Sequence, residues 1–336
     1  MKVGIVGCGS ISKMHAEALS NMENVTISGA ADILPQRAQA LCEKYGGNPY
    51  SSLEELLAAE KLDVLHICTP HHLHVPMAEL AANADCAVFT EKPPAITAAQ
   101  WQQLCRIGER IPIGVCFQNR YNDSVQYIKE LLSKNDYGAF LGARAFLTWA
   151  RDAEYYTESG WRGSLETEGG GVLINQSIHT MDLLVYFLGR PDAVQARKQN
   201  FHLSKIIEVE DSFEAYIEYG KAPVLFYATT AYSANSPVMI ELSFEALTIR
   251  MEETELTLIW PDGKKETKSF LPEAAVGKSY WGSSHSRCIH DFYASLENNL
   301  PPPLGLPQVT DTVELFMAAY AAADSEERVL LRAIKN

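Results

Sequence analysis

The sequence lacks a long apolar run, an excess of basic residues and a paired cysteine motif. No stretch of its 336 residues approaches the roughly 20 consecutive apolar residues that a membrane span needs. Lys and Arg number 28 against 42 Asp and Glu, and the resulting net charge of −14 repels nucleic acid and anionic membranes. The amino terminus enters a strand pattern directly, without the features of a secretory signal. We therefore expect a cytoplasmic protein with no nucleic-acid or membrane partner.

Cysteine usage points to the same compartment. The seven cysteines are odd in number, form no Cys-x-x-Cys pair, and several lie in apolar runs such as 64–68 and 113–117. This pattern predicts buried free thiols in a reducing environment rather than disulfides. Three close histidines, His71, His72 and His74, have no carboxylate or thiol in step with them, so no metal site is predicted.

The first third of the chain alternates short apolar strands with helices. A chain of this length exceeds one ordinary hydrophobic core, so two domains are expected. Nearly continuous apolar strands between helices predict a parallel sheet covered on both faces, the doubly wound Rossmann arrangement, over residues 1–120. The expected strands are 3–6, 25–31, 64–68, 87–89 and 113–117, and the expected helices are 11–22, 35–45, 53–59, 75–83 and 98–109.

The remainder, residues 121–336, predicts an α+β domain with an open, mainly antiparallel sheet. Its strands often alternate apolar and polar residues, as in Phe213 to Tyr219, which indicates one covered face. We expect the less covered face to support a homodimer or homotetramer. The expected strands are 141–150, 193–200, 212–219, 224–232, 238–244, 247–251 and 255–260, and the expected helices are 123–133, 173–188, 286–297 and 308–323.

A glycine turn after the first strand predicts a dinucleotide site. Gly7 permits a tight turn, and Gly9 lets the backbone approach a pyrophosphate at the start of a helix that Ser10 and Ile11 open. Asp32 ends the second strand, where its carboxylate can accept hydrogen bonds from the adenosine ribose. Because that carboxylate repels a 2′-phosphate, NAD is favoured over NADP.

Two further strand ends carry polar residues. Thr69, Pro70, His71 and His74 follow the strand 64–68, and Glu91 with Lys92 follows the strand 87–89. Ligands of open α/β sheets bind at the carboxyl ends of the strands, so these residues are predicted to contact the cofactor. A lysine there can polarise a carbonyl or stabilise an alkoxide, although a solvated lysine is the plainer alternative.

A glycine-rich segment supplies the second set of candidate catalytic residues. Residues 169–171 are all glycine, and Asn175, His179 and Asp182 follow at helical spacing. On a helix over 173–188 they would share one face, and Asp182 would orient the His179 imidazole. Asn175 and His179 are predicted to contact the substrate and to take part in catalysis.

These segments, taken in order, resemble the glucose–fructose oxidoreductase/inositol dehydrogenase/MocA family over essentially the whole chain. The most specific segments are Glu91-Lys92-Pro93 and the run from Gly169 to Asp182; supporting ones are Thr69-Pro70 with His74, 116–121, 161–163 and 209–211. The resemblance implies a Rossmann domain, a C-terminal domain whose open sheet makes oligomer contacts, a catalytic Lys92 and an often cis Pro93. The family commonly carries Asp where this chain has Asn175, so His179 must move the proton.

The predicted function is NAD-dependent hydride transfer at a CH–OH or C=O carbon of a sugar, sugar derivative or cyclitol. Aromatic faces and fixed donors suit such a polyol. The residues expected in its pocket, besides Asn175 and His179, are Arg120, Tyr156, Trp161, Arg162 and His285, and Arg162 is also assigned to the cofactor.

Two alternatives remain open on the same fold. One is an NAD-dependent glycosidase or epimerase that oxidises its substrate transiently and releases no net NADH. The other is a non-enzymatic NAD-sensing regulator, which the presence of both Lys92 and His179 disfavours because a sensor needs neither.

Overall fold

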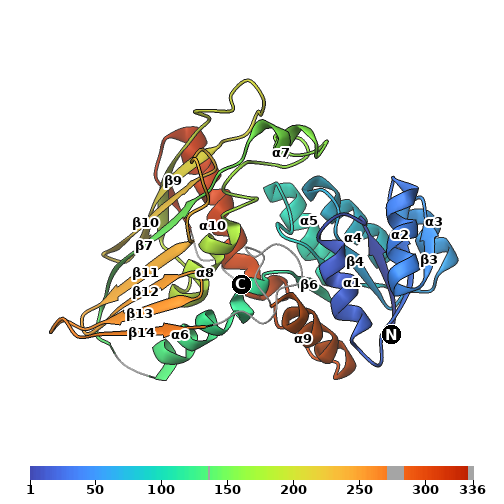
Figure 1. Ribbon diagram of the computed structural model, residues 1–336, viewed down its shortest axis with the longest axis horizontal. Coiled ribbons are helices and arrows are strands. Elements are labelled where there is room, and N and C mark those ends of the chain that lie inside the picture. The colour runs from blue at the N-terminus through green and yellow to red at the C-terminus, as the bar shows by residue number, and fades with distance from the viewer. Residues whose placement is uncertain (135–136, 271–283, 332–336) are drawn as a thin grey trace. The chain divides into compact units, whose positions relative to one another are not determined.

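The computed structural model describes residues 1–134, 137–270 and 284–331, which form two compact units (Figure 1). Among these residues, the first unit comprises 1–118 and 284–309, and the second comprises the rest. The division after Gln118 lies close to the expected one after residue 120. The return of residues 284–309 to the first unit departs from the expectation that 121–336 form one domain. Across the described ranges, no helix is both long and apolar enough to cross a membrane.

The first unit is built on a six-stranded sheet in which every neighbouring pair is parallel. The doubly wound prediction is confirmed. The strand missed by the sequence pattern is the short polar edge strand, residues 48–50. In spatial order the strands are β3 (Asn48–Tyr50), β2 (Thr26–Ala31), β1 (Lys2–Val6), β4 (Val64–Ile67), β5 (Ala87–Thr90) and β6 (Ile113–Val115). The order reverses between β1 and β4, which is where such sheets bind ligands.

Helices flank this sheet (Figure 1). They are α1 (Ser12–Ser20), α2 (Pro35–Tyr45), α3 (Leu53–Ala59), α4 (His74–Asn83) and α5 (Ala98–Gly108), with 3-10 turns η1 (His71–Leu73) and η2 (Gln118–Tyr121). A late helix, α9 (His285–Glu297), also packs here against α1. Its Phe292 ring lies 5.1 Å from that of Phe89, and its Tyr293 hydroxyl bonds to His66. These buried aromatic contacts explain why residues 284–309 join the first unit.

The second unit contains a nine-stranded sheet that is antiparallel except where β7 and β10 run parallel. The mainly antiparallel prediction is confirmed, and the two edge strands, β14 and β15, were not predicted. In spatial order the strands are β14 (Lys265–Ser269), β13 (Glu255–Ile259), β12 (Thr248–Glu252), β11 (Met239–Phe244), β7 (Phe140–Thr148), β10 (Ala222–Thr229), β9 (Ser212–Tyr219), β8 (Ala193–Gln199) and β15 (Val329–Leu330).

One face of this sheet is covered and the other is open. The helices α6 (Asp123–Lys134), α8 (Ile178–Leu188) and α10 (Leu306–Ser325) lie on the covered face (Figure 1). There Phe213 of β9 contacts the Tyr320 ring of α10, with 5.6 Å between ring centroids. On the opposite face Tyr216 and Leu225, a cross-strand pair, remain 42% and 51% exposed. A fourth, short helix, α7 (Ala153–Thr157), was not predicted.

Candidate active site

The glycine turn joins the end of β1 to the start of α1. Gly7 has a φ of +84°, and a Cβ there would lie 2.6 Å from the Cys68 carbonyl oxygen, so only glycine fits. A Cβ at Gly9 would meet nothing within 4 Å, so its backbone faces open space. No side chain caps the N-terminus of α1. Uncapped N–H groups at a helix start and an approachable glycine are what a pyrophosphate requires, so this turn fits NAD.

Asp32 follows β2 and links that strand end to the glycine turn. One carboxylate oxygen accepts a hydrogen bond from the Cys8 N–H (2.7 Å), and the other accepts one from the Leu34 N–H (2.8 Å). Each oxygen retains a second lone pair for a ribose hydroxyl. The position of Asp32 is therefore compatible with its predicted role at the adenosine ribose.

The loops after β4 and β5 are joined by His74. Its Nδ1 lies 2.7 Å from the Pro93 carbonyl oxygen, and its Nε2 lies 2.9 Å from that of Thr69. His74 is buried, and both ring nitrogens contact the main chain, which contradicts its predicted contact with the cofactor. Instead it fixes the two loops to each other. The Lys92–Pro93 peptide is cis, as the family resemblance implied.

Lys92 is the one half-buried residue between Cys86 and Ala95; the others are buried. It leaves the sheet at the carboxyl end of β5, on the edge where Gly7 and Thr69 also emerge. Pro70 and His71 follow on this edge, with Pro70 half-buried at the start of η1 and His71 buried within it. Lys92 therefore lies at the carboxyl edge of the sheet, the edge at which ligands of open α/β sheets bind.

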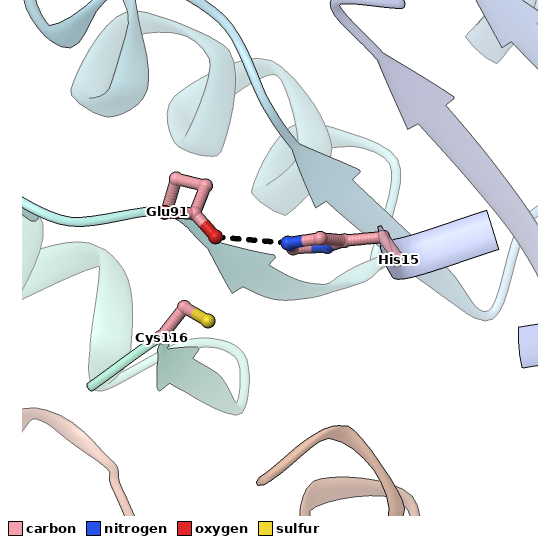
Figure 2. Close-up of side chains that lie close together, drawn as sticks. All are labelled: His15, Glu91 and Cys116. Carbon is pink, nitrogen blue, oxygen red and sulfur yellow. Dashed lines mark hydrogen bonds and ion pairs between the residues drawn. The ribbon is translucent and has the colours of Figure 1, made fainter. Parts of the chain in front are cut away.

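Glu91, beside Lys92, points into the first unit (Figure 2). Its carboxylate lies 2.9 Å from His15 Nε2, and His15 Nδ1 lies 2.8 Å from His66 Nδ1. His66 Nε2 in turn contacts the Tyr293 hydroxyl at 2.9 Å. Because Glu91 is buried and paired with His15, its predicted cofactor contact is replaced by a structural one.

The charged groups of this cluster are His15 and Glu91, which form an ion pair. Burial opposes protonation of His15, but its hydrogen bonds to Cys116 and Glu91 and the Glu91 charge outweigh this and raise its pKa to about 9. Burial opposes ionisation of Glu91, yet His15 holds the Glu91 pKa far below its usual range. His15, Glu91 and Cys116 offer ligand atoms within 4.8 Å of one another. A protonated His15 has no lone pair for a metal, so these contacts favour an ion pair over a metal site.

The ion pair predicts weaker stability at alkaline pH. The folded pKa of His15 is raised from 6.5 to about 9, so the stabilisation is complete below 6.5 and is lost as pH rises through 9. We expect the free energy of unfolding to fall by about 3 kcal/mol across this interval, at 1.36 kcal/mol per pKa unit. Glu91→Gln should flatten this fall in urea titrations. An equally steep fall in both proteins would show that His15 is not the group responsible.

His285 starts α9 in the same buried cluster. Its ring centroid lies 6.4 Å from that of His15, and burial lowers its pKa to about 4. Its Nδ1 has no hydrogen-bond partner within the part of the chain that the structure describes. Because the side chain is 2% exposed, the structure does not support its predicted substrate contact.

In the second unit, Asn175 and His179 are more exposed than the residues around them. From Gly171 to Val185 they are the two half-buried residues, and all others are buried. Asn175 precedes α8, which begins at Ile178 rather than at the expected Leu173. The Glu210 carboxylate accepts hydrogen bonds from the Gly171 and Leu173 N–H groups (2.9 and 3.2 Å) and holds this segment as turns. A Cβ at Gly171 would lie 1.9 Å from the Glu210 carbonyl oxygen, which requires glycine there.

Glu168 is a buried residue that contacts the side chain of Asn175. Its Oε2 accepts a hydrogen bond from the Gly163 N–H (2.5 Å), and its Oε1 accepts one from the Asn175 side-chain amide. The side chain is fully buried. Burial raises the Glu168 pKa to about 7 against the opposing effects of these two hydrogen bonds.

Asp182 binds Arg120 rather than His179. Its two oxygens accept hydrogen bonds from Arg120 Nε (2.9 Å) and Nη2 (2.6 Å), and Thr312 donates another (2.7 Å). Arg120 and Asp182 are both buried. The prediction that Asp182 orients His179 is therefore wrong, and the buried pairing of Arg120 with Asp182 does not support the predicted substrate contact of Arg120.

Tyr156 is also part of the interior. It is 2% exposed and packs with Leu203, Ile207 and Val209, and its hydroxyl lies 3.3 Å from Thr230 Oγ1. This contradicts a contact with substrate. Its neighbour Tyr155 takes the more accessible position.

Trp161 and Arg162 remain compatible with a ligand-binding role. The Arg162 guanidinium carbon lies 4.5 Å from the Tyr155 ring centroid and 4.9 Å from that of Trp161. Both residues are half-buried. Stacking on two aromatic rings presents the guanidinium as a fixed planar donor, a geometry suited to phosphate or hydroxyl oxygens.

Two buried residues in these clusters, His15 and Glu168, were not predicted from the sequence. His15 shares the buried face of α1 with Ser12, Ala16 and Leu19, a helical spacing visible in the sequence. Glu168 precedes the three glycines, but nothing in the sequence indicates that its carboxylate is buried beneath Asn175.

Two protein-family models match this chain. Residues 1–111 match the GFO_IDH_MocA model, described as an oxidoreductase family with an NAD-binding Rossmann fold, and residues 125–250 match the GFO/IDH/MocA C-terminal domain. The chain belongs to the GFO/IDH/MocA oxidoreductase family. The predicted family, fold class, NAD cofactor and dehydrogenase activity are thereby confirmed.

Several relatives within this family bear on function. D-glucoside 3-dehydrogenase of Escherichia coli is 28% identical over 73% of this chain and 74% of its own length. Inositol 2-dehydrogenase of Salmonella typhimurium is 31% identical over 41% and 43%. The WlbA dehydrogenase of Bordetella pertussis, solved with NADH and UDP-GlcNAcA, is 26% identical over 99% of both chains, with a TM-score of 0.86.

Proposed function

We propose that this GFO/IDH/MocA oxidoreductase oxidises a CH–OH group of a sugar, sugar derivative or cyclitol with NAD. The observation that carries the proposal is the placement of Lys92 on the same sheet edge as the glycine turn and Asp32. The sugar and cyclitol activities in the names of the relatives support this substrate class. The reverse reduction would use the same groups.

The cofactor would be held by the glycine turn and Asp32. Gly9, Ser10 and Ile11 would offer backbone N–H groups to its pyrophosphate, with Thr69, Pro70 and His71 on the neighbouring strand end. Arg162 and Trp161 would supply a stacked cation and an aromatic face. When bound, NAD accepts the hydride.

The chain's own side chains would handle the proton. His179 is proposed to accept the hydroxyl proton, since a neutral imidazole is a suitable base near neutral pH. The Lys92 ammonium is proposed to stabilise the alkoxide oxygen, and Asn175 to hold the reacting or a neighbouring hydroxyl group. An amide carries no charge, so Asn175 orients the substrate while the base is elsewhere.

A substrate screen tests the proposed function. The purified protein, supplied with NAD, is mixed with sugars, cyclitols and nucleotide sugars, and NADH absorbance is followed. We expect NADH to form with one or more members of the panel. Sugar cleavage or epimerisation without net NADH would instead favour the transient-oxidation alternative, and no reaction with any member would count against an enzyme of this class.

We also propose a cytoplasmic homodimer or homotetramer. The open face of the nine-stranded sheet carries Tyr216 and Leu225 beside the ion pairs that Glu241 forms with Arg144 and Arg250. A second copy of the same face would bury the apolar pair together with the adjoining ion pairs, since Arg144 is the cross-strand partner of Leu225. The seven free cysteines are consistent with a reducing compartment.

A further inference from the structure

Glu168 connects two segments that carry candidate ligand-binding residues. Gly163, whose N–H binds Glu168 Oε2, directly follows Trp161 and Arg162. Asn175, whose amide binds Glu168 Oε1, precedes α8 and His179. One fully buried carboxylate therefore accepts a hydrogen bond from each segment, so both oxygens are engaged by donors.

The charge of Glu168 determines how Asn175 is oriented. With an ionised carboxylate, Asn175 turns its Nδ2 toward Glu168 and presents Oδ1, an acceptor, on its other side. A protonated carboxyl must donate one hydrogen. The Gly163 N–H is a fixed backbone donor, whereas the Asn175 amide can reverse, so the carboxyl hydrogen would be directed at Asn175. The amide would then rotate by half a turn, accept through Oδ1 and present Nδ2, a donor.

We propose that Glu168 is a positioning residue whose ionised carboxylate holds Asn175 with its oxygen toward the substrate hydroxyl, and whose protonation reverses that amide. This rests on the proposed function, which places Asn175 at the substrate. With Oδ1 toward the substrate, the amide accepts the hydrogen of a hydroxyl group beside the reacting one and fixes its orientation, whereas the reversed amide offers a donor and loses that contact.

The surroundings of Glu168 bring the protonation of its carboxylate to near neutral pH. Burial raises its pKa to about 7, the hydrogen bonds from Gly163 and Asn175 and the Arg162 charge lower it, and the Glu210 charge raises it again. The phenols of Tyr156 and Tyr320 also face the carboxylate, and burial raises the pKa of both. Arg162 is thus the cation and Glu210 the anion that influence Glu168.

The test compares pH profiles of kcat/KM for sugar oxidation in wild type and Glu168→Gln. The glutamine of this variant can accept from the Gly163 N–H and donate to Asn175 Oδ1, which fixes the Asn175 amide as in the protonated state. Above pH 7 we expect kcat/KM to fall roughly 2- to 10-fold, the value of a hydrogen bond between neutral groups. On the acid side of the profile, the slope of log kcat/KM against pH should lose the contribution of one proton. Any decline at low pH that is due to other groups remains. Unchanged kcat/KM and steepness would overturn the proposal.

Glu210→Gln is the matched control. Glu210 is also buried on the glycine segment and also accepts two backbone hydrogen bonds, from Gly171 and Leu173, but it does not contact Asn175. This variant should retain the full steepness of the acid limb. Loss of the same proton in Glu210→Gln would show that disturbance of the segment, rather than the Glu168–Asn175 contact, causes the effect.

Asn175→Ala supplies a second variant if Glu168→Gln does not fold. Since Glu168 acts through Asn175, Asn175→Ala should lose the same proton of steepness, and the double variant should be no slower than Asn175→Ala alone. A full acid limb in Asn175→Ala would overturn the proposal.

A measurement without substrate separates this proposal from the proposed function. The folded pKa of Glu168 is raised from 4.5 to about 7, so its stabilisation is complete below 4.5 and is lost as pH rises through 7. The denaturation midpoint of wild type should therefore fall relative to that of Glu168→Gln between these values. If the denaturation midpoints of the two proteins changed with pH in parallel, the Glu168 proposal would be overturned. Failure of the wild type to oxidise any sugar would instead overturn the proposed function.

Discussion

Replacing Lys92 with alanine should lower kcat for sugar oxidation by about 10²- to 10⁴-fold, the usual contribution of one acid–base or charge-stabilising group. The ammonium is carried by the one half-buried residue between Cys86 and Ala95 and emerges at the carboxyl end of β5, so its loss removes positive charge from the alkoxide oxygen. NAD binding, measured by quenching of tryptophan fluorescence, should be retained, because the glycine turn and Asp32 lie on other strand ends.

Lys61→Ala is the matched control for Lys92. Lys61 is an exposed lysine on the loop before β4, at the opposite edge of the same sheet. Its removal should leave kcat and NAD affinity unchanged. Wild-type turnover in Lys92→Ala, on a substrate that the wild type oxidises, would refute the role of Lys92.

Arg120→Met should lower the free energy of unfolding by about 3–5 kcal/mol, the cost of leaving one partner of a buried ion pair uncompensated. Asp182 is fully buried, and Thr312 alone cannot replace the two bonds that Arg120 donates. Urea denaturation followed by circular dichroism measures the change.

An exposed ion pair in the same chain gives the comparison. Arg110 lies 2.6 Å from Glu79, with side chains 46% and 33% exposed, and Arg110→Met should cost less than about 1 kcal/mol. If Arg120→Met raised KM for substrate while leaving stability at the wild-type value, Arg120 would be a substrate residue after all, as its place in the sequence first indicated.

Sequence periodicity was sufficient for the fold because burial repeats with the secondary structure. Strands buried on both faces, such as β4, are apolar at nearly every position, with His66 as the exception in β4, and β9 alternates in step with its covered face. The elements missed are those whose residues carry little such signal. β3 is Asn-Pro-Tyr, and β14 is mostly charged. The helix α9 was predicted, but its place in the first unit was not, because that place depends on contacts with residues about 200 positions away, as Tyr293 makes with His66.

The candidate site was predictable where chemistry depends on local backbone geometry. Gly7, Asp32 and Lys92 follow from strand ends, and the parallel sheet brings those ends to one edge. Side-chain pairing was not predictable. Arg120 and Asp182 are 62 residues apart, and His15 and Glu91 are 76 apart, so only the folded chain shows that each satisfies its partner.

Hydride transfer from the substrate carbon to NAD is tested most directly with a labelled substrate. A sugar active in the screen is prepared with deuterium on the carbon to be oxidised, and NADH released by the enzyme is examined by mass spectrometry. We expect one deuterium in the NADH and a slower reaction than with the unlabelled sugar. Unlabelled NADH, or sugar conversion with the deuterium retained and no NADH released, would contradict direct hydride transfer.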